Sequence, residues 1–283
     1  MNAELTSSFR DHPLLVRRTR FVHQAQPGQH VLREFTHPQP SFAVCEVATQ
    51  IIGGELPASN GNGEFLFALF PASPATLPDR ERAAQQWLCA AHDGHDGVLE
   101  VVARDDRILW KAGRAAFLGP PERADEMFSP LIEFAFLEAQ IHRLEGEVDA
   151  GWTAAHGDIP LTHQVAENAV ARWSHVNDMT CRVTKCRMDC CDLRRQLSAL
   201  NPEVSLTARQ LLADLCEKAR FSDRLAAVEA RIDAMMGLYQ VANDRLSAYS
   251  YFRREWWLEV WIILVIIAEL LAIFVQLWFA GKK

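Results

Sequence analysis

Apolar residues recur at alternating spacings of three and four in the segment that precedes the most hydrophobic part of the chain. The series comprises Leu225, Val228, Ile232, Met235, Tyr239, Ala242, Leu246 and Tyr249. This heptad seam predicts a helix with one buried face over about four heptads. Periodicity does not show what covers that face, so two interpretations stay open. The seam forms either a coiled coil between copies of the chain or one stripe of an intramolecular bundle.

Beyond the seam the chain loses almost all of its polar positions. Between Val260 and Ala280 the polar side chains are Glu269 and Gln276, apart from tryptophan ring nitrogens. A helix over residues 256–280 would rise about 37 Å, whereas the hydrocarbon core of a bilayer is about 30 Å thick. Tryptophans near both ends are typical of the membrane interfaces. The run therefore predicts a transmembrane helix, and a buried core helix is the alternative.

The position of this run suggests how it reaches the membrane. Only residues 281–283 follow it, and the N-terminus lacks the apolar region of a secretory signal. We therefore expect a single-pass tail anchor in the inner (cytoplasmic) membrane, with the N-terminal domain in the cytoplasm. A polytopic transporter is excluded because the sequence has no second run of this length.

Earlier segments indicate an α+β fold. A proline at the first helical position predicts that a helix begins at Ser129–Pro130, and a second long helix is expected between Leu161 and Asn201. Short apolar runs before them predict strands at 42–52, 64–70, 98–103 and 107–111, the last two forming a hairpin, and a helix beginning near Asp79. We expect an α+β domain over residues 1–125, a helical bundle or coiled-coil stalk over 126–252 and the anchor over 253–283.

Composition and charge narrow the function classes. The chain has 283 residues, of which 49% are hydrophobic and 23% charged, which is typical of a globular protein. Its net charge of −7 makes nucleic acid an improbable partner. Seven cysteines form an odd set without the spacing of a disulfide scaffold, so we expect reduced thiols.

The carboxylates near and within the apolar run are the candidate functional side chains of the anchor. Glu269 lies near the middle of the run, where a carboxyl group needs a partner that a lone helix does not offer. Self-association would supply one. We therefore assign Glu269, with Glu259 and Gln276, to oligomerisation within the membrane.

Two clusters are weak candidates for metal ligation. Cys186 and Cys190 lie four residues apart and would share one face of a helix, but they lack the second ligand pair that zinc sites use. His92 and His95 alternate with aspartates, although the repeated Asp-Gly first of all indicates a turn. Six basic residues between 172 and 195 form a modest basic face, for which a solvated helix surface is the commoner explanation. No familiar catalytic or nucleotide-binding motif is present, so we predict neither a cofactor nor an enzymatic activity.

The string from Arg253 to Leu271 resembles the C-terminal signature of the DUF155 family, the YagE-like membrane proteins. In that family a Leu-Glu-Trp entry precedes an apolar run with a second glutamate ten residues on. Here Glu259 and Glu269 keep the interval, while Val260 is inserted before Trp261. Arg231-Ile-Asp233 is similar to the family's Arg-Leu-Asp, and the segment from Glu133 to Val148 resembles its Ala-Leu-Ala-Gln helix.

The resemblance covers roughly the last 150 residues, and it implies a membrane-anchored protein with no established enzymatic activity. Eukaryotic members of the family resemble mitochondrial inner-membrane factors that support translation, whereas the absence of a transit peptide here favours a bacterial member. We expect a homo-oligomeric scaffold that tethers a cytoplasmic, translation-related protein partner to the bilayer. The alternatives are an ion-conducting assembly lined by the last helix, and a metal-dependent enzyme that uses the cysteine or histidine cluster.

Overall fold

The structure is a computed structural model. It describes residues 15–23, 25–35, 42–51, 64–73, 75–90, 97–163, 172–198 and 205–280. The chain divides into two compact units, and each is discontinuous in sequence. The sheet unit comprises Met1–Gly146 and Met188–Glu229, and the helical unit comprises Glu147–Arg187 and Ala230–Lys283.

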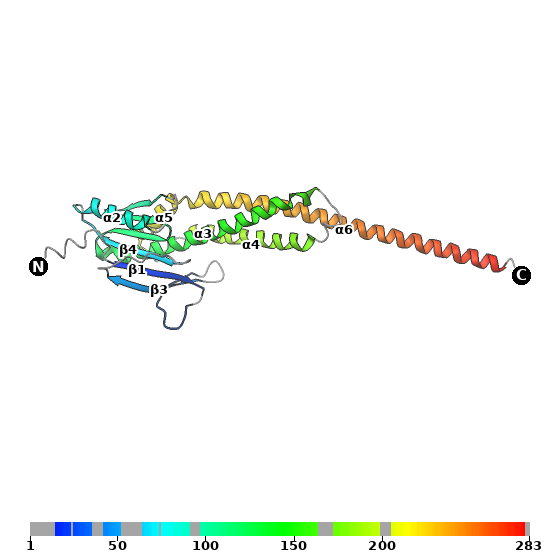
Figure 1. The fold of residues 1–283 in the computed structure, drawn as a ribbon, viewed down its shortest axis with the longest axis horizontal. Coiled ribbons are helices and arrows are strands. Elements are labelled where there is room, and N and C mark those ends of the chain that lie inside the picture. Colours follow the sequence, from blue (N-terminus) through cyan, green and yellow to red (C-terminus); the bar gives the residue numbers. More distant parts are fainter. Residues whose placement is uncertain are drawn as a thin grey trace. The chain divides into compact units, whose positions relative to one another are not determined.

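The sheet unit contains a seven-stranded mixed sheet, which confirms the predicted α+β class (Figure 1). The strand order is β2-β3-β1-β4-β7-β6-β5, and β4 pairs with β7 in parallel whereas the other neighbours are antiparallel. The strands are β1 (Leu15–Val22), β2 (Val31–Phe35), β3 (Phe42–Ile51), β4 (Glu64–Pro71), β5 (Leu99–Ala103), β6 (Asp106–Lys111) and β7 (Arg114–Gly119).

Tight turns join the last three strands. The predicted β5–β6 hairpin is present, with Ala103 paired to Asp106 and Arg104 at φ 58° between them. Ala112 and Gly113 connect β6 to β7, both with positive φ (47° and 75°), as a type I′ turn requires. Strands β1, β2 and β7 were not predicted. Charged residues interrupt the apolar positions of β1 and β2, and β7 is a short, alanine-rich segment with a weak strand signal.

Strand β4 is buried along nearly its whole length because both faces of the sheet are covered. Leu66, Ala68 and Phe70 belong to the core that packs against α2 (Leu77–Cys89). Phe65 and Phe67 alternate with them and meet Phe128 of α3 (Ala124–Asp158) on the opposite face, at ring-centroid distances of 6.2 and 5.1 Å. The two-residue period of a strand thus assigns each aromatic ring to one of two cores.

The predicted helix start at Ser129 was wrong, because helix α3 begins at Ala124 and contains Pro130. Asp125 and Glu126 occupy the first turn, where negative charge is favoured by the helix dipole. Burial of Met127 and Phe128 in the core also stabilises the additional turn. Tertiary packing therefore compensates for the backbone hydrogen bond that Pro130 cannot donate.

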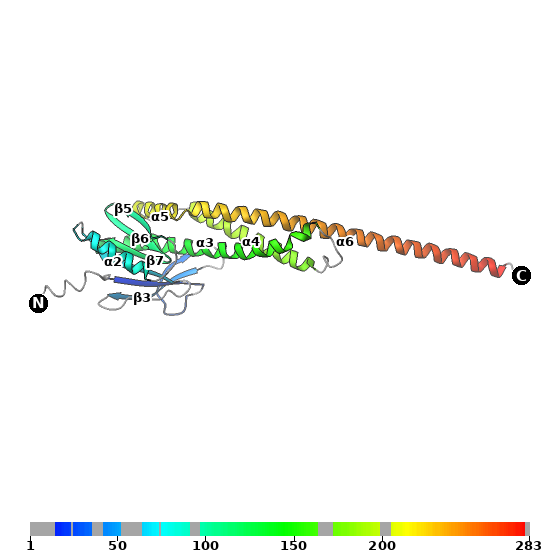
Figure 2. The ribbon, with the colours of Figure 1, turned by 45° about the horizontal axis from the view of Figure 1, so that its top comes forward.

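Three further helices follow. Helix α4 spans Trp173–Ser198, later than the predicted start at Leu161, which lies in a short 3-10 helix (Ile159–Thr162). Helix α5 (Leu206–Lys218) is capped by Ser205, whose hydroxyl accepts a hydrogen bond from the Ala208 amide. Within the sheet unit α5 lies beside the edge strand β5 (Figure 2). Covering an edge in this way blocks its pairing with another strand.

Helix α6 (Phe221–Ala280) carries the whole heptad seam and the whole apolar run. The seam residues from Leu225 to Leu246 are buried in the single chain, none more than 4% exposed. Phe221, at the start of the helix, stacks on Phe134 of α3 with a centroid distance of 5.1 Å. The seam is thus one stripe of an intramolecular bundle, the second of the two interpretations left open by its periodicity.

Candidate functional site

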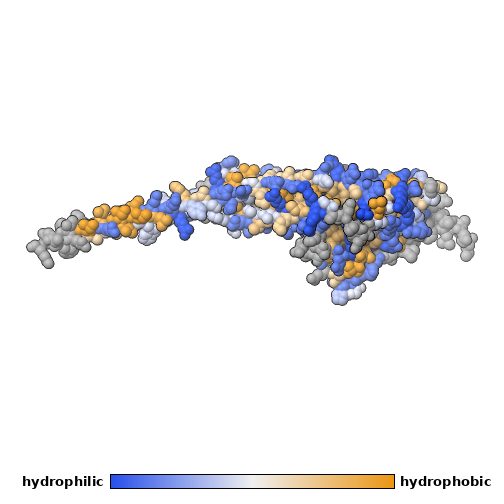
Figure 3. Space-filling model, turned by 180° about the vertical axis from the view of Figure 1, so that it is seen from behind, coloured by the Kyte–Doolittle hydropathy of each residue, from blue (hydrophilic) through white to orange (hydrophobic). Residues whose placement is uncertain are grey.

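The apolar segment of α6, defined as Trp256–Ile273, differs from the rest of the helix in its exposure. Apart from Val260, its large apolar side chains are 47–62% exposed, and they lie on all sides of the helix. Figure 3 shows the aliphatic ones as an orange band near the end of the helix. Among the described helices, α6 is the one that is long and apolar enough to cross a membrane, with a mean hydropathy of 2.2 over its most apolar window.

This exposure would be costly in water. Burying apolar surface stabilises a side chain by roughly 25 cal/mol per Å², and residues of this type normally lie in a core. An apolar patch that encircles a helix is instead typical of a helix surrounded by lipid. The segment therefore has the properties of a membrane anchor.

The predicted intramembrane residues all lie on α6. Glu259 and Glu269 are exposed, and within the described chain neither has a hydrogen-bond or ion-pair partner. Gln276 lies in the last turns of the helix. A lone copy of the helix therefore leaves both carboxylates without a protein partner.

Of the two candidate metal clusters, the structure describes the cysteine pair but not the histidine pair. Cys186 and Cys190 are buried on α4, and the Cys186 thiol points to Glu147 Oε2 at 4.0 Å. His92 and His95 lie outside the described residues. Over the described ranges, no group of three or more His, Cys, Asp and Glu side chains could hold a metal ion.

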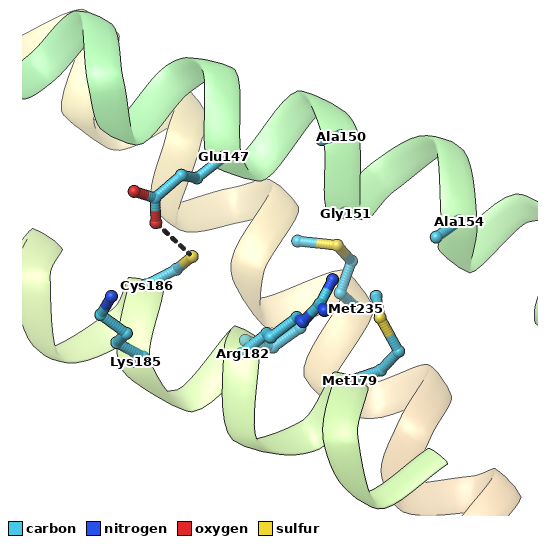
Figure 4. A pocket seen from close by; sticks show the side chains of 10 residues that line it. Glu147, Ala150, Gly151, Ala154, Met179, Arg182, Lys185, Cys186 and Met235 are labelled. Carbon is cyan, nitrogen blue, oxygen red and sulfur yellow. Dashed lines mark hydrogen bonds between the residues drawn. The ribbon is translucent and has the colours of Figure 1, made fainter. Parts of the chain in front are cut away.

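The helical unit contains a pocket of about 350 Å³ between its three helices (Figure 4). We call it the α3–α4–α6 pocket. Small residues of α3 form one wall, and methionines of α4 and α6 and a valine of α4 form the others. Charged side chains lie at the rim. The lining residues are Glu147, Ala150, Gly151, Ala154, Met179, Arg182, Val183, Lys185, Cys186 and Met235.

A partly buried polar cluster also joins the three helices of this unit. Asp158, at the end of α3, accepts hydrogen bonds from the Tyr239 hydroxyl at 3.0 Å and from His175 Nε2 at 2.7 Å. Tyr239 is fully buried. Burial, and next the hydrogen bond to Asp158, raise the pKa of the Tyr239 hydroxyl, so it stays protonated and donates. Tyr239 was predicted only as a seam residue, because its partner is 81 residues away in sequence.

The sheet unit holds a buried carboxylate and a thiol whose pKa values are shifted by their surroundings. Glu64 on β4 accepts hydrogen bonds from Arg18 and Arg20 on β1. Burial alone would raise the pKa of Glu64, but the two arginines outweigh it and lower the pKa below its usual value. Burial raises the pKa of the Cys216 thiol to about 12, and the Glu133 charge adds to the shift, so this thiol is not a nucleophile at neutral pH.

Comparison with known proteins gives no relative: no family model matches the sequence, and no curated protein matches it.

Sequence reasoning identified the apolar segment but not the α3–α4–α6 pocket. The basic residues between 172 and 195 were the one available signal, since two of them, Arg182 and Lys185, line it. The remaining lining residues come from three segments far apart in sequence, which no local pattern connects.

Proposed function

We propose that this chain is a membrane-anchored, non-enzymatic scaffold that holds an α+β domain at the surface of a bilayer. The contrast within α6 carries this proposal. The seam residues are buried by the chain itself, whereas the apolar segment is exposed on nearly every side. The seam is buried on one side and faces water on the other, whereas the apolar segment is exposed all round. Lipid is the surrounding that stabilises such an apolar segment.

The proposal includes self-association through the apolar segment rather than through the seam. The seam is already occupied by intramolecular packing, so it offers no free face to a second copy. Glu269 is the remaining reason for association, because a carboxyl group in hydrocarbon is stabilised by a hydrogen-bonding partner. The same residue on a neighbouring copy supplies that partner when one of the two is protonated.

The proposed site of action is the inner (cytoplasmic) membrane, with the sheet unit in the cytoplasm. Relatedness to the DUF155 family, and with it a translation-related protein partner, is a separate proposal that rests on the residue pattern around Glu259 and Glu269 alone. Membrane anchoring does not depend on it.

Fractionation and cross-linking of the full chain in native membranes test the proposal. We expect the protein to resist extraction by alkaline carbonate, and protease added to the cytoplasmic face of inverted vesicles to digest the sheet unit. Cross-linking should give homo-oligomers that the Glu269→Leu variant loses while it stays in the membrane fraction. Wild-type protein released by carbonate would refute anchoring, and oligomers unaffected by Glu269→Leu would refute the role of this carboxylate.

A further inference from the structure

The α3–α4–α6 pocket combines an apolar interior with charged side chains at its rim. Two of these are the cations Arg182 and Lys185. The third is the Glu147 carboxylate, which accepts a hydrogen bond from the Cys186 thiol. Met179 and Val183 of α4 and Met235 of α6 line it, opposite the small surface of Ala150 and Gly151 on α3. Methionine side chains adapt readily to the shape of an apolar ligand. A pocket that is mostly apolar with a few polar groups at one place is the usual form of a small-molecule site.

The two cations at this rim have no partner among the residues that the structure describes. Arg182 and Lys185 line the pocket, and within the described chain neither has a hydrogen bond or an ion pair. Figure 4 shows Arg182 reaching across the mouth of the pocket toward Met235, with Lys185 on the same side as Cys186. Other arginines of α4 are paired: Arg187 with Asp233, Arg194 with Glu229 and Arg195 with Asp192.

A pocket of the sheet unit shows the opposite arrangement. It holds about 400 Å³, but its charged side chains already have partners within the described chain. Arg224 makes two hydrogen bonds to Glu145, and Glu138 accepts the Trp110 ring N–H at 2.9 Å. Charges already satisfied in this way offer little to a ligand. The unpaired cations are therefore what distinguishes the α3–α4–α6 pocket.

We infer that the α3–α4–α6 pocket binds a small amphipathic acid, with its acidic group at Arg182 and Lys185 and its apolar body between Met179, Met235 and Gly151. An acid satisfies the two cations through charge-assisted hydrogen bonds. Its body displaces water from an apolar surface. The volume of about 350 Å³ equals that of about a dozen water molecules, at a share of roughly 30 Å³ each, so the ligand has on the order of ten to twelve non-hydrogen atoms.

Distance along α6 favours a water-soluble acid over a lipid of the bilayer. Met235 precedes Trp256 by 21 residues on one continuous helix, which is about 32 Å at 1.5 Å per residue. A lipid in the membrane would have to leave it to reach the pocket. The pocket is built within the helical unit and does not depend on membrane anchoring, whereas this preference for a water-soluble ligand rests on the proposed function.

The Cys186 thiol in the pocket wall is a built-in reporter. We propose measuring its alkylation by N-ethylmaleimide, peptide by peptide in a mass spectrometer, on the full chain in phosphatidylcholine nanodiscs with and without decanoate. Cys181 is exposed on the same helix and outside the pocket lining, and Cys190 is buried, so these two thiols are internal controls. Decanoate should slow alkylation of Cys186 alone, about tenfold or more at saturation. Decan-1-ol, which lacks the charge, should need at least about tenfold more ligand for the same effect, as expected for the loss of a charged hydrogen bond.

Variants separate the two parts of the site. Replacing both Arg182 and Lys185 by glutamine should raise the decanoate concentration for half-protection about tenfold or more, whereas Arg195→Gln should leave it unchanged. Gly151→Leu fills the interior, and its Cβ would lie 3.4 Å from Met235 Sδ, an ordinary contact. This variant should keep the helical circular dichroism of the wild type and lose the dependence of Cys186 alkylation on decanoate.

Four results would overturn the inference. These are an unchanged Cys186 rate in decanoate, equal protection by decan-1-ol, equal protection of all three thiols, and equal half-protection in the double-glutamine variant. A fifth result would assign the pocket to lipid. In this result, Cys186 is alkylated more slowly when phosphatidylglycerol replaces phosphatidylcholine in the nanodisc, with no decanoate added. The double-glutamine variant restores the faster rate.

Discussion

Two lysines placed in the apolar segment should release the protein from membranes. The 14 Leu, Ile, Val and Phe residues between Val260 and Ala280 favour insertion by roughly 4–8 kcal/mol, and Glu269 opposes it by about 3 kcal/mol. Each lysine near the centre costs about 3 kcal/mol and also removes the contribution of the isoleucine it replaces. The variant Ile263→Lys with Ile267→Lys therefore shifts the balance by roughly 6–8 kcal/mol, enough to cancel insertion.

The exposure of these positions makes the test specific. Ile263 and Ile267 are 56% and 47% exposed in the chain, so the substitutions fill no cavity and break no packing within it. The matched control places two lysines on α6 ahead of the segment, at the exposed positions Gln240 and Ala248. Flotation of vesicles on a density gradient measures the bound fraction. We expect wild type and control to float and the double variant of the segment to stay at the bottom.

Flotation of that double variant at the wild-type level would refute the reasoning. It would mean that contacts other than the apolar segment hold the protein on the vesicle. Loss of flotation in the control would equally refute it, because charge added outside the segment would then suffice. Helicity of both variants, measured by circular dichroism, should remain that of the wild type.

Three further predictions concern stability. Tyr239→Phe removes the buried hydrogen bond to Asp158 and should lower the free energy of unfolding by about 1.5–3 kcal/mol in urea titrations, with no loss in the Asp158→Asn background if the two residues act together. Ile232→Ala should lower the free energy of unfolding by about 2–5 kcal/mol. If the seam is intramolecular, the unfolding midpoint of this variant should be unchanged by a tenfold dilution of protein. Because the pKa of Glu64 is lowered in the fold, its stabilisation is present above the usual carboxyl pKa and is lost as the pH falls through the lowered value. Glu64→Gln should therefore be less stable than wild type at pH 7, and thermal unfolding should show the gap closing as the pH falls below the usual carboxyl pKa.

The predictable parts of the fold are those set by local patterns. The seam of α6, the β5–β6 hairpin and the helix after Pro78 follow from spacing, turn residues and a helix-start signal, and the structure contains each of them. The start of α3 was wrong because Pro130 was treated as a boundary. Burial of Phe128 against Phe65 and Phe67 of β4, which no neighbouring residue reveals, stabilises the turn before it.

The candidate sites show the same division. Length and composition are enough to predict the apolar segment, because the thickness of a bilayer sets the length of one continuous stretch of chain. The pocket depends on side chains that meet only after folding: Glu147 lies 39 residues from Cys186, and Met235 lies on another helix again. The period of the seam likewise does not show what covers it, since the period is the same for a partner within the chain or outside it.

The discontinuity of the sheet unit sets an order of events during synthesis. Its core contains Phe134 stacked on Phe221, so the aromatic layer on α3 stays incomplete until the ribosome has passed residue 221. Trp256 follows 35 residues later, a delay of about 2–7 seconds at 5–20 residues per second. The nascent chain thus has only a brief interval in which to close its first domain before a strongly hydrophobic stretch is made, and slower translation there should improve the yield of correctly folded protein.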